Sequence, residues 1–126
     1  MRTSEWVSPG HPDKIADNIS EYILDRYLEK DSNVRYALEV MIKNNNVYLG
    51  GEITSTHQFS VADIEQFVRD AIRNIGYNAD YYSKWKDYAI NINKIKVIND
   101  SHIQSPDISQ GVDNNGWGDQ GIFWGY

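Results

Sequence analysis

The sequence predicts an α+β domain, in which a mostly antiparallel sheet carries two helices on one face. Two stretches with an apolar residue at every third or fourth position predict the helices. Between them lie two alternating apolar stretches joined by an asparagine-rich turn, a pattern typical of a β-hairpin. The chain has 126 residues, which suffices for one domain with a hydrophobic core.

The first helix is predicted over residues 13–30. Pro12 suits the first helical position, because the N–H group that proline lacks would have no intrahelical partner there. Acidic side chains fall on the side opposite the apolar face. The apolar face repeats every four residues and includes Ile15, Ile19, Ile23 and Tyr27.

The hairpin is predicted from VRYALEVMI (34–42) and VYLGGEITS (47–55), with the turn KNNN (43–46) between them. Closing the chain at this turn pairs Ile42 with Val47. Apolar residues occupy alternate positions in each strand, so one face of the hairpin is expected to pack on the core.

Two glutamates share the opposite face of this hairpin. The register places Glu39 opposite Gly50, and it places Glu52 opposite Ala37, so the two glutamates are diagonal neighbours. Such carboxylates repel each other unless a cation lies nearby. The pair is either part of a solvated sheet face or a site for a metal cation or an ammonium group. Gly50 and Gly51 favour a site, because glycine in a strand often marks close approach of a ligand or another chain.

The second helix begins after Ser60, which is a favoured capping residue. Asp63 follows three positions later, close to the capping-box pattern. Gly76 is expected to end the helix. The apolar face of this helix consists of Ile64, Phe67, Val68, Ala71, Ile72 and Ile75.

The remaining sequence predicts a polar, aromatic-rich loop at 77–87 and a strand at 88–98 that is broken near Lys94. The domain division that follows is a first domain at 1–103, a mobile loop at 104–121, and the opening strand of a truncated next domain at 122–126. Loops of this length usually act as lids or binding segments.

Composition excludes several classes of function. The net charge is −6 and the sequence has no basic cluster, so we expect no nucleic-acid surface. The chain has no cysteine and therefore no thiol nucleophile or cysteine zinc site. The apolar runs are only a few residues long and no signal peptide is visible, so we expect a cytoplasmic protein that does not enter a membrane.

Two further stretches carry candidate chemistry. In SPGHPDK (8–14), His11 and Asp13 stand at the mouth of the first helix. They are either a helix start capped by the aspartate, or a site where the imidazole contacts a phosphate and the carboxylate binds its divalent ion. The polar segment 104–121 is either a disordered loop or a flap that closes over a substrate. It has no EF-hand calcium pattern.

Taken together, these stretches resemble the N-terminal part of S-adenosylmethionine synthetase (methionine adenosyltransferase). The resemblance runs from residue 3 to residue 126 and favours the functional alternatives above. The segments that carry it are TSEWVSPGHPDKIADNISEYILD, ALEV, GGEIT, IRNIGY, QSPDISQGVD and GDQGIFWGY.

The resemblance implies an activity that transfers the adenosyl group of ATP to the sulfur of L-methionine. The triphosphate leaves and is then cleaved to phosphate and pyrophosphate. The resemblance also implies Mg²⁺ and K⁺ as cofactors. It implies a homo-oligomer, either a dimer or a dimer of dimers, in which facing subunits share each active site.

The resemblance further implies roles for individual residues. Catalytic roles fall to His11 and Asp119, and ATP binding to His11 and Lys14. Methionine binding falls to Glu52, Gln104 and Asp119. Asp13 is implied as a magnesium ligand and Glu39 as a potassium ligand. The lid is implied to contain Asp107, Ile108 and Gly118.

The sequence also departs from the family pattern. Pro9 stands where the family usually has glutamate, and Trp117 stands where alanine is usual, which could alter the lid or substrate choice. Family members are much longer and have three similar domains, so residues 1–126 by themselves are expected to be inactive. The alternatives are a non-catalytic fragment that dimerises with or regulates a complete synthetase, and a metal-dependent phosphohydrolase that retains only triphosphate cleavage.

Overall fold

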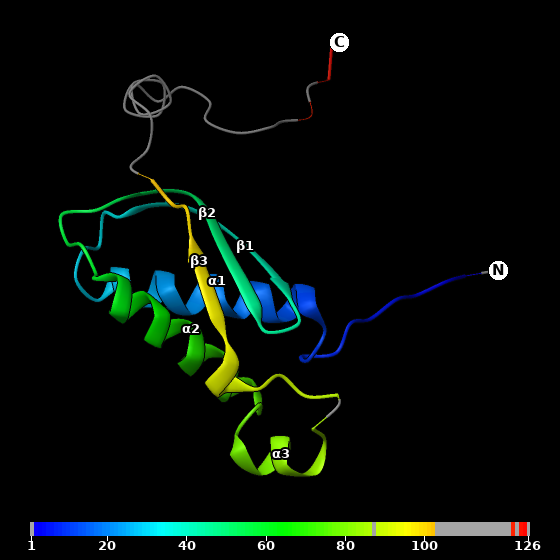
Figure 1. The fold of residues 1–126 in the computed structure, drawn as a ribbon. Helices are drawn as coiled ribbons and strands as arrows, with labels where there is room; N and C mark the ends of the chain where they lie inside the picture. Colours follow the sequence, from blue (N-terminus) through cyan, green and yellow to red (C-terminus); the bar gives the residue numbers. More distant parts are fainter. Residues whose placement is uncertain (1, 87, 103–121, 123, 126) are drawn as a thin grey trace.

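The computed structural model describes residues 2–86, 88–102, 122, 124 and 125. These residues form an α+β fold, as the sequence predicts (Figure 1). The elements are α1 (Pro12–Leu28), β1 (Arg35–Lys43), β2 (Asn46–Thr54), α2 (Val61–Ile75), α3 (Ala79–Lys84), the 3₁₀ turn η1 (Ile92–Lys94) and β3 (Lys96–Asn99). The predicted loop at 104–121 lies outside the described residues.

The helix α1 begins one residue before the predicted start and ends two residues before the predicted end. Its cap is His11, whose side chain accepts a hydrogen bond from the backbone of Asp13, and Pro12 occupies the first turn. The aspartate is therefore not the capping residue, which corrects that alternative. The predicted four-residue apolar repeat is fully buried and consists of Ile15, Ile19, Ile23 and Tyr27.

The helix α2 forms as predicted. The Asp63 amide donates to the Ser60 hydroxyl at 3.2 Å, and the Ser60 amide donates to the Asp63 carboxylate at 3.0 Å, which completes a capping box. The Ser60 side-chain and backbone hydrogen bonds lower the pKa of Asp63. Gly76 ends the helix with φ of 121°, a conformation that other residues rarely adopt.

The sheet has the strand order β1-β2-β3. The strands β1 and β2 are antiparallel in the predicted register, with Ile42 opposite Val47. The strand β3 pairs with β2 in parallel over four residue pairs, beside nine antiparallel pairs between β1 and β2, so the mostly antiparallel sheet is mixed. This direction follows from the connection, because α2 crosses over between β2 and β3 and returns the chain to the same end.

Two predictions for residues 77–98 are wrong in part. Within the expected loop, α3 forms after Asn78, whose side chain accepts from the Tyr81 amide at 2.9 Å. Within the expected strand, only Lys96–Asn99 joins the sheet. The Asn91 side chain accepts from the Asn93 amide at 3.0 Å and so stabilises η1 in place of a longer strand.

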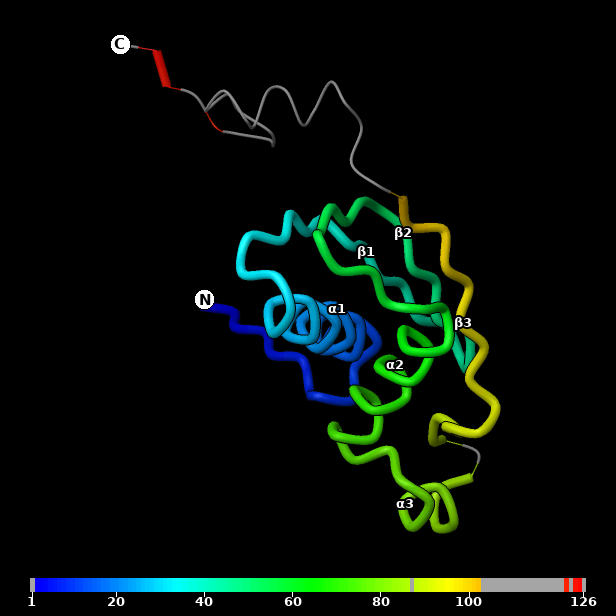
Figure 2. The backbone as a smooth tube through the Cα atoms, turned by 90° about the vertical axis from the view of Figure 1, so that its left-hand side faces the viewer, coloured from blue at the N-terminus to red at the C-terminus, as the bar shows by residue number. Residues whose placement is uncertain are grey.

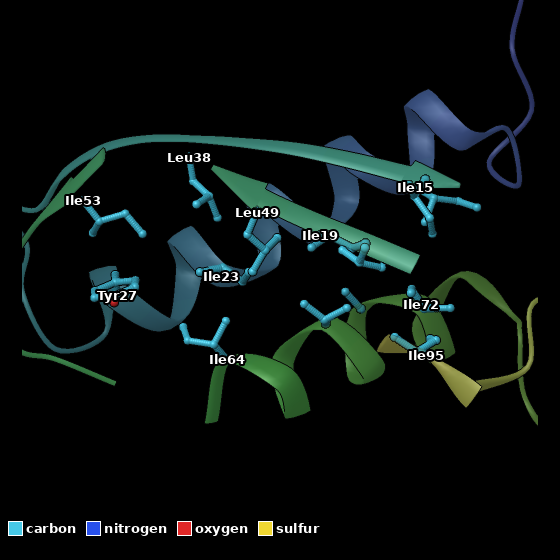
Figure 3. Packing of buried hydrophobic residues seen from close by; sticks show 14 residues of the cluster. Ile15, Ile19, Ile23, Tyr27, Leu38, Leu49, Ile53, Ile64, Ile72 and Ile95 are labelled. Carbon is cyan, nitrogen blue, oxygen red and sulfur yellow. The ribbon is translucent and has the colours of Figure 1, made fainter. Parts of the chain in front are cut away.

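The core lies between the sheet and the two long helices, which cover the same face (Figures 2 and 3). Isoleucines from α1 and α2 meet Leu38, Val47 and Leu49 from the strands. Burying one such side chain completely stabilises the fold by about 1.5–3 kcal/mol. Within residues 2–86 and 88–102, none of the helices has the length and apolar character that a bilayer crossing requires.

Candidate functional site

The first candidate group is the turn before α1. The His11 amide donates to the Ser8 carbonyl at 2.9 Å, and the Asp13 amide donates to His11 Nδ1 at 3.1 Å. Because Nδ1 accepts a hydrogen bond, the proton of the neutral imidazole belongs on Nε2. The His11 side chain is 42% exposed, so Nε2–H is available to donate to an anion.

Asp13 and Lys14 follow in the first turn of the helix. The Asp13 carboxylate is 88% exposed and lies 3.8 Å from His11 Nδ1. Lys14 Nζ contacts the Asp17 carboxylate at 3.1 Å, so its ammonium group is already paired on the helix surface. The helix N-terminus favours anions through its free N–H groups. Asp13 would repel an anion unless a metal cation lay between them.

The second candidate group is the sheet face that the helices leave uncovered. Glu39 lies opposite Gly50 and Glu52 lies opposite Ala37, which confirms the predicted register and places both glutamates on this face. Glu39 is exposed and Glu52 is half-buried. The two carboxylates provide hard oxygen ligands of one sign, which suit a cation or an ammonium group.

Gly50 and Gly51, which lie next to these glutamates, differ in whether the fold requires a glycine. Gly51 has φ of 93°, and a Cβ atom there would lie 2.1 Å from the Ala37 carbonyl oxygen. The backbone of β1 therefore requires glycine at this position, which corrects the interpretation that a ligand requires it. A Cβ atom at Gly50 would meet nothing within 4 Å, so no contact among the described residues excludes a side chain there.

The chain after β3 continues beside β2 as far as His102. The His102 amide donates to the Gly51 carbonyl at 2.9 Å, and the Ile53 amide donates to the His102 carbonyl at 2.9 Å. These bonds form a bridge between His102 and Glu52. The described part of this segment therefore ends beside Glu52. The His102 imidazole is exposed, whereas His57 is half-buried against Phe59 with ring centroids 4.6 Å apart.

The structure brings His11 close to Asp13, and it brings Glu39 close to Glu52, but it keeps the two pairs apart. α1 lies on the core face of the sheet, while the glutamates lie on the opposite face. Across the part of the chain that the structure describes, no cluster of three or more histidine and acidic side chains could hold a metal ion. Five predicted site residues lie outside the described residues: Gln104, Asp107, Ile108, Gly118 and Asp119.

Comparison with known proteins identifies the family of this domain. Residues 1–106 match the family model described as the S-adenosylmethionine synthetase N-terminal domain. The chain belongs to the S-adenosylmethionine synthetase family. It is 47% identical to the S-adenosylmethionine synthase of Mycoplasma capricolum subsp. capricolum, over 98% of this chain and 31% of that protein. It is 41% identical to the S-adenosylmethionine synthase of Zymomonas mobilis, with the same coverage of each chain.

The solved structures agree with this family. An unusual S-adenosylmethionine synthetase from Campylobacter jejuni is similar to this chain with a TM-score of 0.70 and 43% sequence identity. The similarity covers 82% of this chain and 27% of that one. The chain thus spans about a third of the length of its synthetase relatives, and it corresponds to their N-terminal domain.

Sequence reasoning did not assign a role to one residue beside the α1 turn. The Tyr77 hydroxyl donates to the Gly10 carbonyl at 3.2 Å and thereby links the end of α2 to the turn that carries His11. Tyr77 directly follows the helix-ending Gly76, and a glycine that reverses the chain presents the next side chain back toward the fold. The motif IRNIGY contains Tyr77, but Gly10 lies 67 positions away in the sequence, so the motif alone does not reveal this contact.

Proposed function

We propose that this chain is the N-terminal part of a methionine adenosyltransferase, which forms S-adenosylmethionine from ATP and L-methionine and releases phosphate and pyrophosphate. The observation that supports this proposal most strongly is the match of residues 1–106 to the N-terminal domain of the synthetase family. The geometry agrees, because an exposed imidazole donor stands at a helix N-terminus and two carboxylates share an open sheet face.

The chemistry of this reaction suits a site without a catalytic base. A lone pair of the methionine sulfur forms the bond to the ribose C5′ atom, and the C5′–O bond breaks with its electron pair leaving on the triphosphate. The thioether is neutral and carries no proton to remove, so in this transfer step the protein mainly stabilises charge on the leaving group and keeps water away from the C5′ atom. The later cleavage of the triphosphate to phosphate and pyrophosphate consumes one water molecule. In this proposal His11 donates from Nε2 to a triphosphate oxygen, beside the α1 amide groups, and Lys14 binds the same group.

The described residues fit the cofactors that the family implies. Asp13 offers one exposed carboxylate, which matches the way Mg²⁺ is held by one or two carboxylates together with substrate phosphates. Glu39 offers one exposed oxygen ligand for K⁺. When bound, the cations would neutralise negative charge on the triphosphate. Glu52 would then face the methionine ammonium group, and Gln104 would join it.

The path of the chain supports pairing Glu52 with Gln104. His102 bridges Glu52, and Gln104 follows His102 by two positions. Two residues of chain span at most about 7 Å. Asp119 as a substrate-contacting residue and Asp107, Ile108 and Gly118 as parts of a lid are proposed with the same function.

We also propose that the enzyme is a homo-oligomer in which two copies meet through the open sheet face. This face carries an apolar row, in which Met41 lies opposite Tyr48 and Tyr48 lies opposite Ile98. Met41 is 60% exposed and Tyr48 is 38% exposed, so part of this apolar row is open to solvent. A second copy on this face would lie against Glu39 and Glu52, so it would contribute to the site.

The test is a chimera in which this chain replaces the matching segment of the Mycoplasma capricolum synthase. We expect the chimera to form S-adenosylmethionine from ATP, methionine, Mg²⁺ and K⁺, and we expect residues 1–126 alone to form none. His11→Ala in the chimera serves as the matched inactive control. A well-folded chimera without activity would contradict the proposed function.

The alternative is a non-catalytic fragment that associates with a complete synthetase. Two observations favour considering it: the chain spans about a third of its relatives, and its net charge of −6 alone would oppose a triphosphate. Adding residues 1–126 to the complete Mycoplasma capricolum enzyme distinguishes the two. A change in its activity or oligomeric state, together with an inactive chimera, would favour the alternative.

A further inference from the structure

We propose that Tyr77 is a positioning residue, which holds the turn before α1 through the Gly10 carbonyl and so orients His11. The inference deepens the proposed function, because its catalytic meaning rests on His11 contacting the triphosphate. No sequence motif assigns Tyr77 this role. Three contacts in the structure support the proposal.

The first contact fixes the peptide unit that enters His11. The Gly10 carbonyl and the His11 amide belong to one planar peptide group. The carbonyl accepts from the Tyr77 hydroxyl at 3.2 Å, and the amide donates to the Ser8 carbonyl at 2.9 Å. With hydrogen bonds at both ends, this peptide plane cannot rotate freely, so the direction in which the His11 side chain begins is set.

The second contact fits Gly10 to the tyrosine hydroxyl. A Cβ atom on Gly10 would lie 2.8 Å from the Tyr77 hydroxyl oxygen, whereas the nearest ring carbons would be 3.7 and 3.9 Å away. The first distance is so short that the hydroxyl would have to move, and the other two are ordinary van der Waals contacts. The hydroxyl, and not the ring, is therefore what an alanine at position 10 would displace.

The third contact fixes the tyrosine ring itself. Gly76 ends α2 with a positive φ and turns the chain, and the Asn78 amide closes this turn by donating to the Gly76 carbonyl at 2.8 Å. The ring is partly buried against the core and meets Tyr81 edge-on at 5.5 Å between centroids. It also lines a cavity of about 310 Å³ beside the turn, together with Ile15 and Ile42.

The hydroxyl is suited to act as a constant donor. Burial raises the pKa of Tyr77 above its ordinary value, and the neighbouring Tyr81 adds to the rise. The group therefore stays protonated at neutral pH and remains a hydrogen-bond donor to the Gly10 carbonyl there.

The first experiment compares Tyr77→Phe with Tyr81→Phe in the 126-residue chain by NMR. Tyr77→Phe keeps the ring and removes only the hydroxyl. We expect hydrogen-exchange protection of the His11 amide to fall about threefold to tenfold, which is the effect of losing one ordinary hydrogen bond. We also expect the His11 side-chain nitrogen signals to move from a single Nε2–H tautomer toward an average. The amides of Val68 and Ile72 in α2 should not change.

The second experiment tests the coupling between the two groups. Gly10→Ala should disturb the His11 signals strongly in the wild-type background, and only weakly when combined with Tyr77→Phe, because the colliding oxygen is then absent. Equal effects in both backgrounds would overturn the proposal. So would His11 signals and protection that stay unchanged in Tyr77→Phe, or that change equally in Tyr81→Phe.

A kinetic comparison in the chimera connects the contact to function. Tyr77→Phe should raise the KM for ATP several-fold and leave the KM for methionine unchanged, because the disturbed group faces the triphosphate. Unchanged KM values for both substrates in an active chimera would overturn the catalytic part. An inactive wild-type chimera would instead be a failure of the proposed function, and the NMR experiments, which need no substrate, would still decide whether Tyr77 orients His11.

Discussion

Asp31 shows how a single carboxylate joins two loops at one end of the domain. It lies after α1, and it accepts hydrogen bonds from the Thr56 amide at 2.7 Å, the Asn33 amide at 3.0 Å and the Ser55 hydroxyl at 2.9 Å. These donors, with the Thr56 amide as the largest contributor, lower the pKa of Asp31 from 3.8 to about 2. Through these hydrogen bonds, the segment before β1 is joined to the segment after β2.

The lowered pKa of Asp31 predicts a specific acid sensitivity. A group whose folded-state pKa is lower than its unfolded-state pKa stabilises the fold above the unfolded value, and that contribution is lost as the pH falls. For Asp31 the loss should occur between pH 3.8 and about 2. Urea unfolding between pH 6 and pH 2 should show a steeper acid loss for the wild type than for Asp31→Asn. Parallel curves would contradict the prediction, and the exposed Asp13→Asn serves as the control.

The two glutamates of the open face should differ in function. In the chimera, Glu52→Gln should raise the KM for methionine by roughly tenfold or more, because a hydrogen bond between charged groups contributes about 1.5–3 kcal/mol. Glu39→Gln should instead weaken activation by K⁺. Steady-state kinetics with methionine and K⁺ varied separately distinguish the two. Identical profiles for both variants, or a Glu52→Gln enzyme with unchanged methionine dependence, would show that the assignment is wrong.

At the scale of elements, the sequence predicts best where local pattern and tertiary packing agree. The hairpin register follows from alternation and turn length, and α2 follows from its capping box and apolar face. The direction of β3 depends instead on the crossover through α2, which no local pattern records. Pro12 takes the first helical position of α1 as predicted, but the cap is the His11 imidazole and not the aspartate that one alternative placed there.

The features of the candidate site likewise divide into those that local pattern predicts and those that depend on tertiary packing. The shared face of Glu39 and Glu52 could be predicted from the period of a strand, since it is a property of local geometry. The contact between Tyr77 and Gly10 could not, because it depends on how α2 ends relative to the start of α1. The reason for Gly51 was likewise hidden, since its close neighbour is the backbone of another strand.

The two adjacent glycines of β2 provide a matched test of that reason. Gly51→Ala would place a Cβ atom 2.1 Å from the Ala37 carbonyl oxygen and force an unfavourable positive φ. We expect it to lower the free energy of unfolding by at least about 2 kcal/mol. Gly50→Ala has open space and should change it by less than about 0.5 kcal/mol. Chemical denaturation checks both, and similar effects of the two substitutions would contradict the structural explanation.

At the scale of the whole molecule, charge and topology both favour a proposed site that is completed by further protein. The net charge of −6 disfavours binding of a triphosphate without added cationic groups. His11 and Asp13 lie at the start of a helix on one side of the sheet, and the two glutamates lie on the other side. Under the proposed function, each described group would be one part of a site that other residues of a longer chain or of a second copy complete.

Introducing a charge on the open sheet face tests whether a second copy covers this face. Met41→Lys places an ammonium group at the β1 end of the apolar row, where a partner subunit would remove it from water. Removing a charge from water is costly even with Glu39 two positions away on the same face, so the dimer dissociation constant of the chimera should rise at least about tenfold. Leu28→Lys adds the same charge at an exposed apolar position at the end of α1, where a cation is favourable, and should leave the constant unchanged. Sedimentation velocity over a range of concentrations measures the dissociation constants of both variants.

If Met41→Lys leaves the oligomer intact, or if Leu28→Lys dissociates it equally, the copies do not meet through this face. Glu39 and Glu52 would then have to be completed by the remaining domains of their own chain.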